Sequence, residues 1–140
     1  MMIEFVVEPA KEQCDAIYQG LLNFNSPHFP DREITKVACF VKNSKGELAG
    51  GLTGEIFSNT FYIQYFWLDE SCRGEGLGSQ VFAKAEREAA ALGATDIYLD
   101  TYSFQAAGFY LKLGFRQVGK YSGFPTKGVD KIFLQKSIED

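Results

Sequence analysis

Arg73-Gly74-Glu75-Gly76-Leu77-Gly78 is the most informative stretch of the sequence, because it separates an apolar segment, Phe61 to Leu68, from an amphipathic stretch. Glycine permits positive φ angles and lets the backbone approach a ligand closely. The first N–H groups of the helix that follows have no partner within the helix, and the helix dipole adds partial positive charge there. A glycine-rich turn between a strand and a helix therefore predicts a binding site for an anion such as a phosphate.

Two common phosphate-binding motifs do not fit this turn. The nucleotide-triphosphate loop needs a Lys and then a Ser or Thr after its last glycine, whereas Ser79 and Gln80 follow Gly78. The dinucleotide fingerprint G-x-G-x-x-G is also missing, since the turn reads R-G-E-G-L-G. The turn is therefore expected to hold the phosphates of a different ligand.

An arginine-led R-G-x-G-L-G turn after an apolar strand resembles the acyl-CoA loop of the GNAT superfamily of N-acetyltransferases. A second stretch, Ala106-Ala107-Gly108-Phe109-Tyr110-Leu111-Lys112-Leu113-Gly114-Phe115, resembles that family's A-x-x-x-Y-x-x-x-G-F segment. One helix and one strand fit between the two motifs, which is the separation that the family requires. The resemblance covers nearly the whole chain. It implies an enzyme that moves an acetyl group from acetyl-CoA to a primary amine of a small molecule or peptide.

The order of polar and apolar residues predicts an α/β fold of the α+β type as a single domain over residues 1–140. Its core is a mixed, mostly antiparallel sheet of about seven strands flanked by helices. The expected strands cover residues 3–7, 35–42, 47–57, 60–68, 95–100, 115–121 and 129–137. The first helix is expected from Ala10 to about Asn25, facing the sheet. A second follows the glycine turn and ends at a cap on Gly93, and a short third runs from a cap at Ser103 to Gly114.

The resemblance also assigns residues to the acetyl-CoA site. In this family the pantetheine arm lies between two diverging strands and bonds to the edge of the strand before the loop. The residues that this implies are Phe66, Trp67 and Leu68 for the arm, and Arg73, Gly74, Glu75, Gly76, Leu77, Gly78 and Ser79 for the pyrophosphate. Ser103 replaces the family's usual Asn and can still donate one hydrogen bond, and Gln105 is expected to take over the contact with the cofactor arm, so both are predicted cofactor contacts.

The chemistry requires donors for two developing negative charges, the tetrahedral oxyanion and the departing thiolate. A backbone N–H near Leu68 can serve the oxyanion. Tyr110 occupies the family's general-acid position and can protonate, or hydrogen-bond to, the sulfur. The sequence does not name the base for the amine, and Glu55, Asp69 and Asp100 remain open as carboxylates near strand ends. Tyr62 and Gln64 are expected on the acceptor side, sharing the strand parity of Phe66 and Leu68.

The acceptor walls are expected from Leu22 to Glu33 and from Tyr121 to Gly128, by resemblance to the family. These segments hold the aromatic residues Phe24, His28, Phe29, Tyr121 and Phe124. Phe29 and Phe124 join Tyr62 and Gln64 as predicted substrate contacts, because aromatic rings can enclose an alkylammonium group. Packing between the two loops and a dimer contact remain open as other uses for these rings.

Composition limits the remaining classes of function. The formal net charge is −4 and the basic residues are scattered, so no nucleic-acid partner is expected. Three separated cysteines and one histidine predict neither a disulfide framework nor a metal site. We expect a cytoplasmic protein without membrane contact, and a homodimer is compatible with the sequence. Two other functions remain open: an N-terminal or lysine acetyltransferase of proteins, and a module that binds acyl-CoA without turnover.

Overall fold

The computed structural model describes residues 1–29, 33–105 and 107–138. The chain forms two compact units, Met1–Arg32 and Glu33–Asp140. The first unit contains the N-terminal helix, and the second contains the sheet.

The first unit consists of helix α1, Lys11–Asn25, and a 3-10 turn η1, Ser26–His28, which follows it directly. The predicted N-terminal helix is confirmed, whereas its contact with the sheet remains a prediction. The strand predicted over residues 3–7 is wrong, because this segment has no regular secondary structure. A strand needs a neighbour for its N–H and C=O groups, and the described part of this unit contains no second strand.

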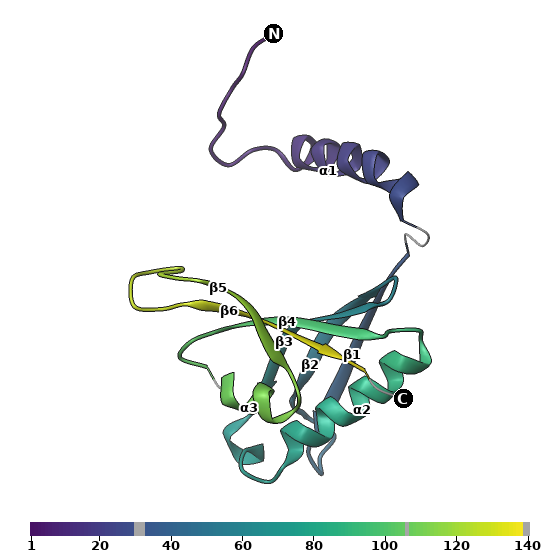
Figure 1. Ribbon diagram of the computed structural model, residues 1–140, viewed down its shortest axis with the longest axis vertical. Coiled ribbons are helices and arrows are strands. Elements are labelled where there is room, and N and C mark those ends of the chain that lie inside the picture. Colours follow the sequence, from purple (N-terminus) through teal and green to yellow (C-terminus); the bar gives the residue numbers. More distant parts are fainter. Residues whose placement is uncertain (30–32, 106, 139–140) are drawn as a thin grey trace. The chain divides into compact units, whose positions relative to one another are not determined.

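The second unit is built on a mixed sheet of six strands in the order β1-β2-β3-β4-β6-β5 (Figure 1). The strands are β1 Ile34–Lys42, β2 Leu48–Phe57, β3 Thr60–Leu68, β4 Asp96–Tyr102, β5 Arg116–Tyr121 and β6 Lys131–Ser137. Every neighbouring pair is antiparallel except β3 and β4, which are parallel. The mixed, mostly antiparallel sheet is therefore confirmed, with one strand fewer than predicted because residues 3–7 do not pair.

Two helices follow the loops that leave β3 and β4. Helix α2, Leu77–Ala91, connects the parallel strands, and α3, Ala107–Lys112, precedes β5. Gly93 has a φ of 99°, and its N–H donates to the Ala90 carbonyl (3.0 Å), so it ends α2 in the left-handed conformation expected of a glycine cap.

The hydrophobic core lies between one face of the sheet and the helices α2 and α3. Ile97 and Leu99 of β4 and Leu134 of β6 are at most 2 % exposed. They pack in one cluster with Val81 and Phe82 of α2. Alternate residues of the same strands therefore lie on the opposite face of the sheet, where Tyr98 stacks on Phe133 at 6.5 Å between ring centroids.

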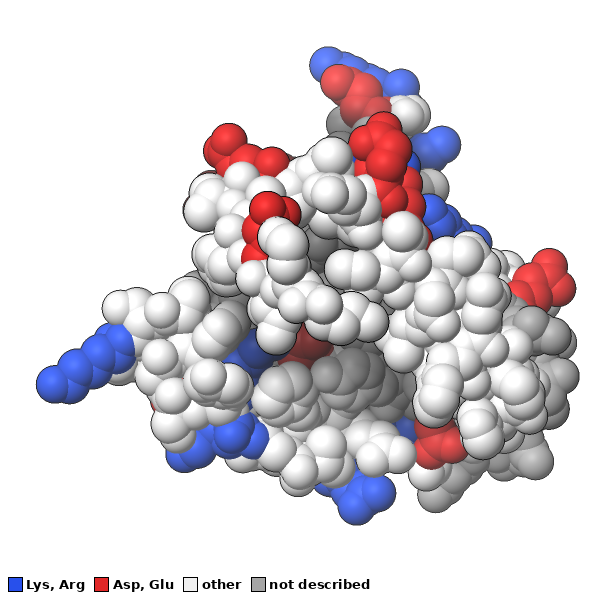
Figure 2. Space-filling model, turned by 90° about the horizontal axis from the view of Figure 1, so that it is seen from above, with Lys and Arg blue, Asp and Glu red and all other residues white. Residues whose placement is uncertain are grey.

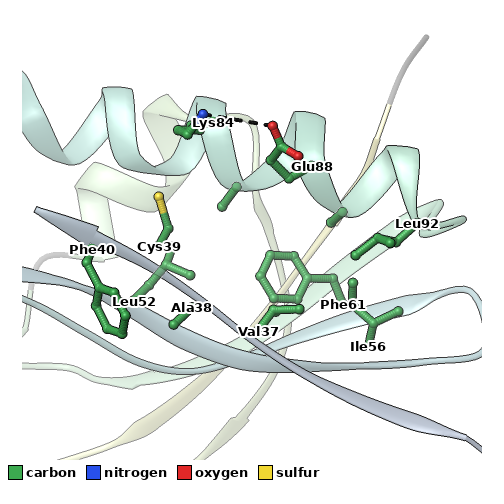
Figure 3. A pocket seen from close by; sticks show the side chains of 12 residues that line it. Val37, Ala38, Cys39, Phe40, Leu52, Ile56, Phe61, Lys84, Glu88 and Leu92 are labelled. Atoms are coloured by element: carbon green, nitrogen blue, oxygen red, sulfur yellow. Dashed lines mark ion pairs between the residues drawn. The ribbon is translucent and has the colours of Figure 1, made fainter.

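A recess of about 230 Å³ lies between α2 and strands β1 and β2 (Figure 3). Val37, Leu52 and Leu92 are among its mostly apolar lining, and Lys84 and Glu88 form an ion pair at 3.8 Å beside it. The recess contains none of the residues predicted to bind acetyl-CoA or the acceptor. It is a gap in the packing of α2 on the edge of the sheet.

Charged side chains lie in small groups of either sign on the face shown in Figure 2, among a largely uncharged surface. No helix within the described ranges is both long enough and apolar enough to cross a membrane.

Replacing a core residue of β4 tests this packing. Ile97 is fully buried, so Ile97→Ala is expected to lower the free energy of unfolding by about 2–5 kcal/mol through lost burial and a new cavity. Urea denaturation followed by circular dichroism measures the change. Val118→Thr on β5 is the control, because Val118 is 49 % exposed and its replacement should stay within about 0.5 kcal/mol. Equal losses in the two variants would contradict the assignment of the core.

Candidate functional site

The glycine-rich turn has the backbone geometry of an anion site. After β3, residues Glu70–Cys72 form a 3-10 turn, η2, and the chain then passes through Gly74 and Gly76, with φ angles of 82° and 75°. Gly76 is the N-cap residue of α2, and its carbonyl accepts the N–H of Gln80 (3.2 Å). The N–H groups before Gln80 in the first turn therefore have no acceptor within the helix and are available to phosphate oxygens.

Arg73 orients this turn. Its Nε donates to the backbone carbonyl of Leu68 at 3.0 Å, so the guanidinium attaches the loop to the end of β3. The resemblance assigned Arg73 to the pyrophosphate, and this contact shows that it also orients the loop. Glu75 at the tip is exposed.

Gly78 is placed where α2 meets two aromatic rings. A Cβ atom on Gly78 would lie 3.1 Å from the ring of Phe109 and 3.3 Å from that of Phe66. These two rings stack on each other at 5.7 Å between centroids. The glycine thus lets the first turn of α2 approach β3 and α3 closely.

One edge of β3 becomes unpaired close to the turn. The β3–β4 ladder contains only three pairs, Thr60↔Asp96, Phe61↔Ile97 and Tyr62↔Tyr98. On its other side β3 continues to pair with β2 as far as Gly50↔Leu68. The parallel strands β3 and β4 therefore separate midway along β3, as the family resemblance implies.

The backbone of Leu68 faces this unpaired edge. The N–H of Asp69 donates to the carbonyl of Ala49 (2.8 Å), and hydrogen-bonded and non-hydrogen-bonded pairs alternate in an antiparallel ladder. Leu68 consequently directs its N–H and C=O away from β2. Arg73 takes the carbonyl, and the N–H lies on the side from which β4 has diverged. Phe66, two residues earlier, has the same orientation, so both residues can bond to an extended ligand.

A β-bulge interrupts β3 just beyond the last pair with β4. Tyr65 pairs with Thr53 and Ile63 pairs with Gly54, so Gln64 is the additional residue. One extra residue reverses which face the following side chains occupy. Ile63 lies in the core before the bulge, and Phe66 after it packs on Phe82 of α2 at 5.0 Å.

Because of the bulge, the prediction that Tyr62 points to the same face as Phe66 and Leu68 is wrong. Tyr62 does not share a face with Phe66, because Tyr62 stacks on Tyr98 at 5.2 Å on the side of the sheet opposite α2. The prediction assumed an unbroken two-residue period along the strand. Tyr62 lies on the face opposite α2, and its contact with the acceptor remains a prediction, whereas Phe66 belongs to the helix-covered face.

Tyr110 reaches the helix-covered face from α3. It is 9 % exposed and packs edge-to-face against Phe82 and Phe115, with centroids 5.7 and 6.0 Å away. Burial raises the pKa of its hydroxyl above the ordinary value of 10.0. The hydroxyl therefore stays protonated at neutral pH and retains a proton to donate. Ala106, the first residue of the motif that contains Tyr110, lies outside the described residues.

Ser103 does not cap α3, contrary to the prediction. The helix begins at Ala107, and Ser103 instead bonds to Asp130, ahead of β6: its N–H donates to the Asp130 carbonyl (2.8 Å) and its Oγ accepts the Asp130 N–H (2.9 Å). The Asp130 carboxylate in turn accepts the N–H of Gly123 (3.1 Å). Ser103 therefore attaches the end of β4 to the loop between β5 and β6.

Gln105 turns back onto β4. Its Oε1 accepts hydrogen bonds from the Thr101 hydroxyl (2.8 Å) and from the N–H of Tyr102 (2.9 Å). The carbonyl end of the side chain thus closes the turn after β4, and only the amide nitrogen is left for the contact with the cofactor arm that the sequence suggested.

The face of the sheet opposite α2 carries an ionisable cluster where β3 and β4 separate. Asp100 of β4 lies on this face close enough to the hydroxyls of Tyr62 and Tyr98 to influence their ionisation. Burial and then the negative charge of Asp100 raise the pKa values of both tyrosines above 10.0. Glu55, the cross-strand neighbour of Tyr62 on β2, raises the pKa of Tyr62 further. Two neutral phenols and two carboxylates therefore meet at this point.

Lys131 of β6 completes the cluster. Its Nζ lies 3.6 Å from Oδ1 of Asp100, 5.3 Å from the ring centroid of Phe124 and 6.0 Å from that of Phe133. Phe124 also contacts Tyr121 at 5.1 Å, so the loop between β5 and β6 folds its aromatic residues together beside this lysine.

Sequence reasoning missed Lys131, Tyr98 and Phe133 as members of the site. Side chains alternate between the two faces of a strand, so the sequence could have shown that Tyr98 lies opposite Leu99 and that Lys131 and Phe133 lie opposite Leu134. The order of the strands in the sheet was needed to show that β6 lies beside β4 and brings Lys131 to Asp100.

Asp69 differs from the other two carboxylates. The hydroxyl and the N–H of Ser71 donate to it and lower its pKa below the ordinary value. These hydrogen bonds attach the Asp69 carboxylate to η2.

The first unit holds the remaining predicted contacts. Phe24 and His28 have ring centroids 6.4 Å apart, and Phe29 follows directly after η1. Residues 30–32 of the predicted acceptor wall lie outside the described residues. Phe29 remains a predicted contact. Within the described ranges, no group of three or more His, Cys, Asp and Glu residues is arranged to hold a metal ion.

Known proteins match this chain over most of its length. A family model described as "Acetyltransferase (GNAT) family" matches residues 7–115. Blasticidin-S acetyltransferase from Streptomyces morookaense is 32 % identical over 114 residues, which cover 81 % of this chain and 83 % of that protein. An acetyltransferase from Agrobacterium fabrum is 29 % identical over 121 residues, covering 86 % of this chain and 88 % of that protein.

Solved structures agree with these matches. The crystal structure of an acetyltransferase from Bacillus cereus superposes with a TM-score of 0.87 at 31 % identity, over 96 % of this chain and 97 % of that one. The glycine-rich turn, the separation of β3 from β4 and the matches in sequence and structure together establish that this chain belongs to the GNAT family of acetyltransferases.

Proposed function

We propose that the protein transfers the acetyl group of acetyl-CoA to a primary amine of a small molecule, by direct attack of the amine on the thioester. The observation that carries this proposal is the separation of β3 from β4 beyond Tyr62↔Tyr98. It leaves an unpaired backbone edge between the anion-binding turn and the carboxylate cluster on the opposite face. A small-molecule acceptor is supported by the relative that acetylates blasticidin S.

The turn and the edge of β3 would hold the donor. The N–H groups at the start of α2 suit the pyrophosphate, and the outward-facing backbone of Phe66 and Leu68 suits the amide groups of the pantetheine arm. This arrangement would bring the thioester to the end of the β3–β4 ladder. The N–H of Leu68 would then donate to the oxyanion formed when the amine adds to the carbonyl carbon.

Tyr110 on the helix-covered face and Asp100 on the opposite face would each perform one of the two proton transfers. The buried phenol of Tyr110 would donate to the departing sulfur. Asp100 would accept a proton from the amine, since an alkyl amine with a pKa near 10.4 costs about 4–5 kcal/mol to deprotonate at pH 7. Tyr62 and Tyr98 lie beside this carboxylate, and its charge helps to raise their pKa values and keep them protonated.

Calorimetry with acetyl-CoA, followed by thiol release in the same preparation, tests the function. The acceptor panel contains blasticidin S, polyamines, aminoglycosides, amino acids and short peptides. Binding together with release on one small amine supports the proposal. Release only on peptides would favour a protein acetyltransferase, and binding without release on any acceptor would favour a binding module.

Tyr110→Phe removes the proposed proton donor while keeping the ring. We expect kcat to fall about 100-fold, within the range typical of general acids. Because burial raises the pKa of Tyr110, the hydroxyl is protonated throughout the neutral range, and the ratio of wild-type to variant kcat should be constant from about pH 6 to about pH 9. Steady-state rates across this range measure the ratio, with Tyr18→Phe in α1 as the control. An unchanged kcat would refute the role of Tyr110.

Gly76→Ala tests the anion-binding turn, with Gly93→Ala as the matched control at the other end of α2. Both glycines have positive φ, 75° and 99°, and open space where a Cβ would lie. Each substitution should cost about 1–2 kcal/mol of backbone strain. Only Gly76→Ala should also raise the Kd for acetyl-CoA, by about tenfold, which calorimetry would detect. A similar rise in both variants would mean that general destabilisation is responsible.

Phe124→Ala tests the acceptor wall. Phe124 packs on Tyr121 and lies beside Lys131 in the loop between β5 and β6. Its loss should raise the KM for the acceptor by about tenfold, equivalent to 1.4 kcal/mol, and leave the KM for acetyl-CoA within a factor of two of wild type. Equal effects on both KM values would remove this loop from the acceptor site.

A further inference from the structure

An amine of the protein itself already occupies the cluster where the acceptor amine is expected. The ammonium group of Lys131 lies between the Asp100 carboxylate, at 3.6 Å, and the rings of Phe124 and Phe133, at 5.3 and 6.0 Å. A carboxylate and aromatic faces are the groups that bind an alkylammonium ion. The surroundings of Lys131 thus have the chemistry expected of a subsite for an amine acceptor.

The position of this lysine follows from the order of the strands. Lys131 pairs with Tyr102, and Phe133 pairs with Asp100, at the end of β4 that has separated from β3. Leu134 is buried on the helix-covered face, and Phe133 stacks on Tyr98 on the other face. Lys131, two residues before Phe133, shares the face of Phe133 and reaches the Asp100 carboxylate there.

We propose that Lys131 is a self-acetylation site: bound acetyl-CoA transfers its acetyl group to the Nζ of Lys131 when no external amine fills the subsite. This inference rests on the proposed function, because it needs the thioester at the end of the β3–β4 ladder. The four-carbon stem of lysine gives the amine the freedom to move from the ion pair toward the carbonyl carbon.

The reaction balances without a further reagent. The ammonium of Lys131 gives one proton to Asp100, which passes it to water, and the free amine attacks the acetyl carbonyl carbon. The C–N bond forms, the C–S bond breaks, and the nitrogen loses a second proton as CoA leaves as a thiol protonated through Tyr110. The products are N-acetyl-lysine, CoA and one released proton.

Lys120 provides an internal reference for chemical acetylation that needs no enzyme. It lies on the neighbouring strand β5 and pairs with Asp130 at 3.9 Å, and its side chain is 49 % exposed, against 28 % for Lys131. Simple reaction with acetyl-CoA in solution should therefore modify Lys120 at least as fast as Lys131. Catalysed transfer within the site would instead acetylate Lys131 faster than Lys120.

The experiment incubates the whole protein with acetyl-CoA alone and follows each lysine by peptide mass spectrometry. We expect Lys131 to acquire an acetyl group at least about ten times faster than Lys120, with a rate constant that does not change on dilution. Tyr110→Phe and Asp100→Asn should each slow the modification of Lys131 at least about tenfold and leave that of Lys120 unchanged. Lys131→Arg keeps the cation and should remove the fast phase.

Other outcomes overturn the proposal. Equal rates at the two lysines, or rates at Lys131 that are the same in wild type and Tyr110→Phe, would show uncatalysed chemistry. Binding of acetyl-CoA by calorimetry without modification of Lys131 would refute self-acetylation and leave the proposed transferase intact. Absence of acetyl-CoA binding would instead refute the proposed function, and the self-acetylation with it. Circular dichroism of each variant checks that slower modification does not come from unfolding.

Discussion

The short ladder between β3 and β4 is the constraint on which the rest of the site depends. Two parallel strands that pair over only three residues leave the N–H and C=O groups on one edge of β3 without sheet partners beyond Tyr62, while the other edge stays paired with β2. Backbone polar groups require a partner or solvent, so an unpaired strand edge is a ready template for an extended ligand. Here the edge ends at Leu68, whose carbonyl is held by Arg73 of the glycine-rich turn. The same interaction therefore aligns the strand edge with the anion site.

The sheet also divides the chemistry between two different environments. On the helix-covered face, Tyr110 is packed among aromatic rings, and burial alone raises the pKa of its phenol. On the opposite face, Asp100 carries the negative charge that helps to raise the pKa of Tyr62 and Tyr98. Thr101 and Asp100 are adjacent in β4, and alternation directs one side chain to each face. The proposed proton donor, Tyr110, and the proposed proton acceptor, Asp100, would therefore act from opposite faces of the sheet.

The sequence predicted the parts of this architecture that depend on local periodicity. The helix after the turn, its glycine cap at Gly93 and the six strands of the sheet follow from side-chain spacing and glycine chemistry. Three features depend on partners distant in the chain and could not be predicted in this way. Residues 3–7 alternate as a strand would but do not pair, the bulge at Gln64 exists only relative to β2, and Ser103 bonds to Asp130 of the β5–β6 loop.

The contacts of the three candidate carboxylates distinguish them, whereas their positions in the sequence do not. Asp69, Asp100 and Glu55 all lie close to a strand end, so the sequence treats them alike. Ser71 stabilises the charge of Asp69 with two hydrogen bonds and lowers its pKa, which makes proton uptake less favourable. Asp100 instead lies 3.6 Å from the ammonium of Lys131. A base must offset about 4–5 kcal/mol to free an alkyl amine at neutral pH, and only a carboxylate in contact with that amine can contribute. The contact of Lys131 with Asp100 is therefore the reason for proposing the acceptor site beside Asp100, and no family motif contains this lysine.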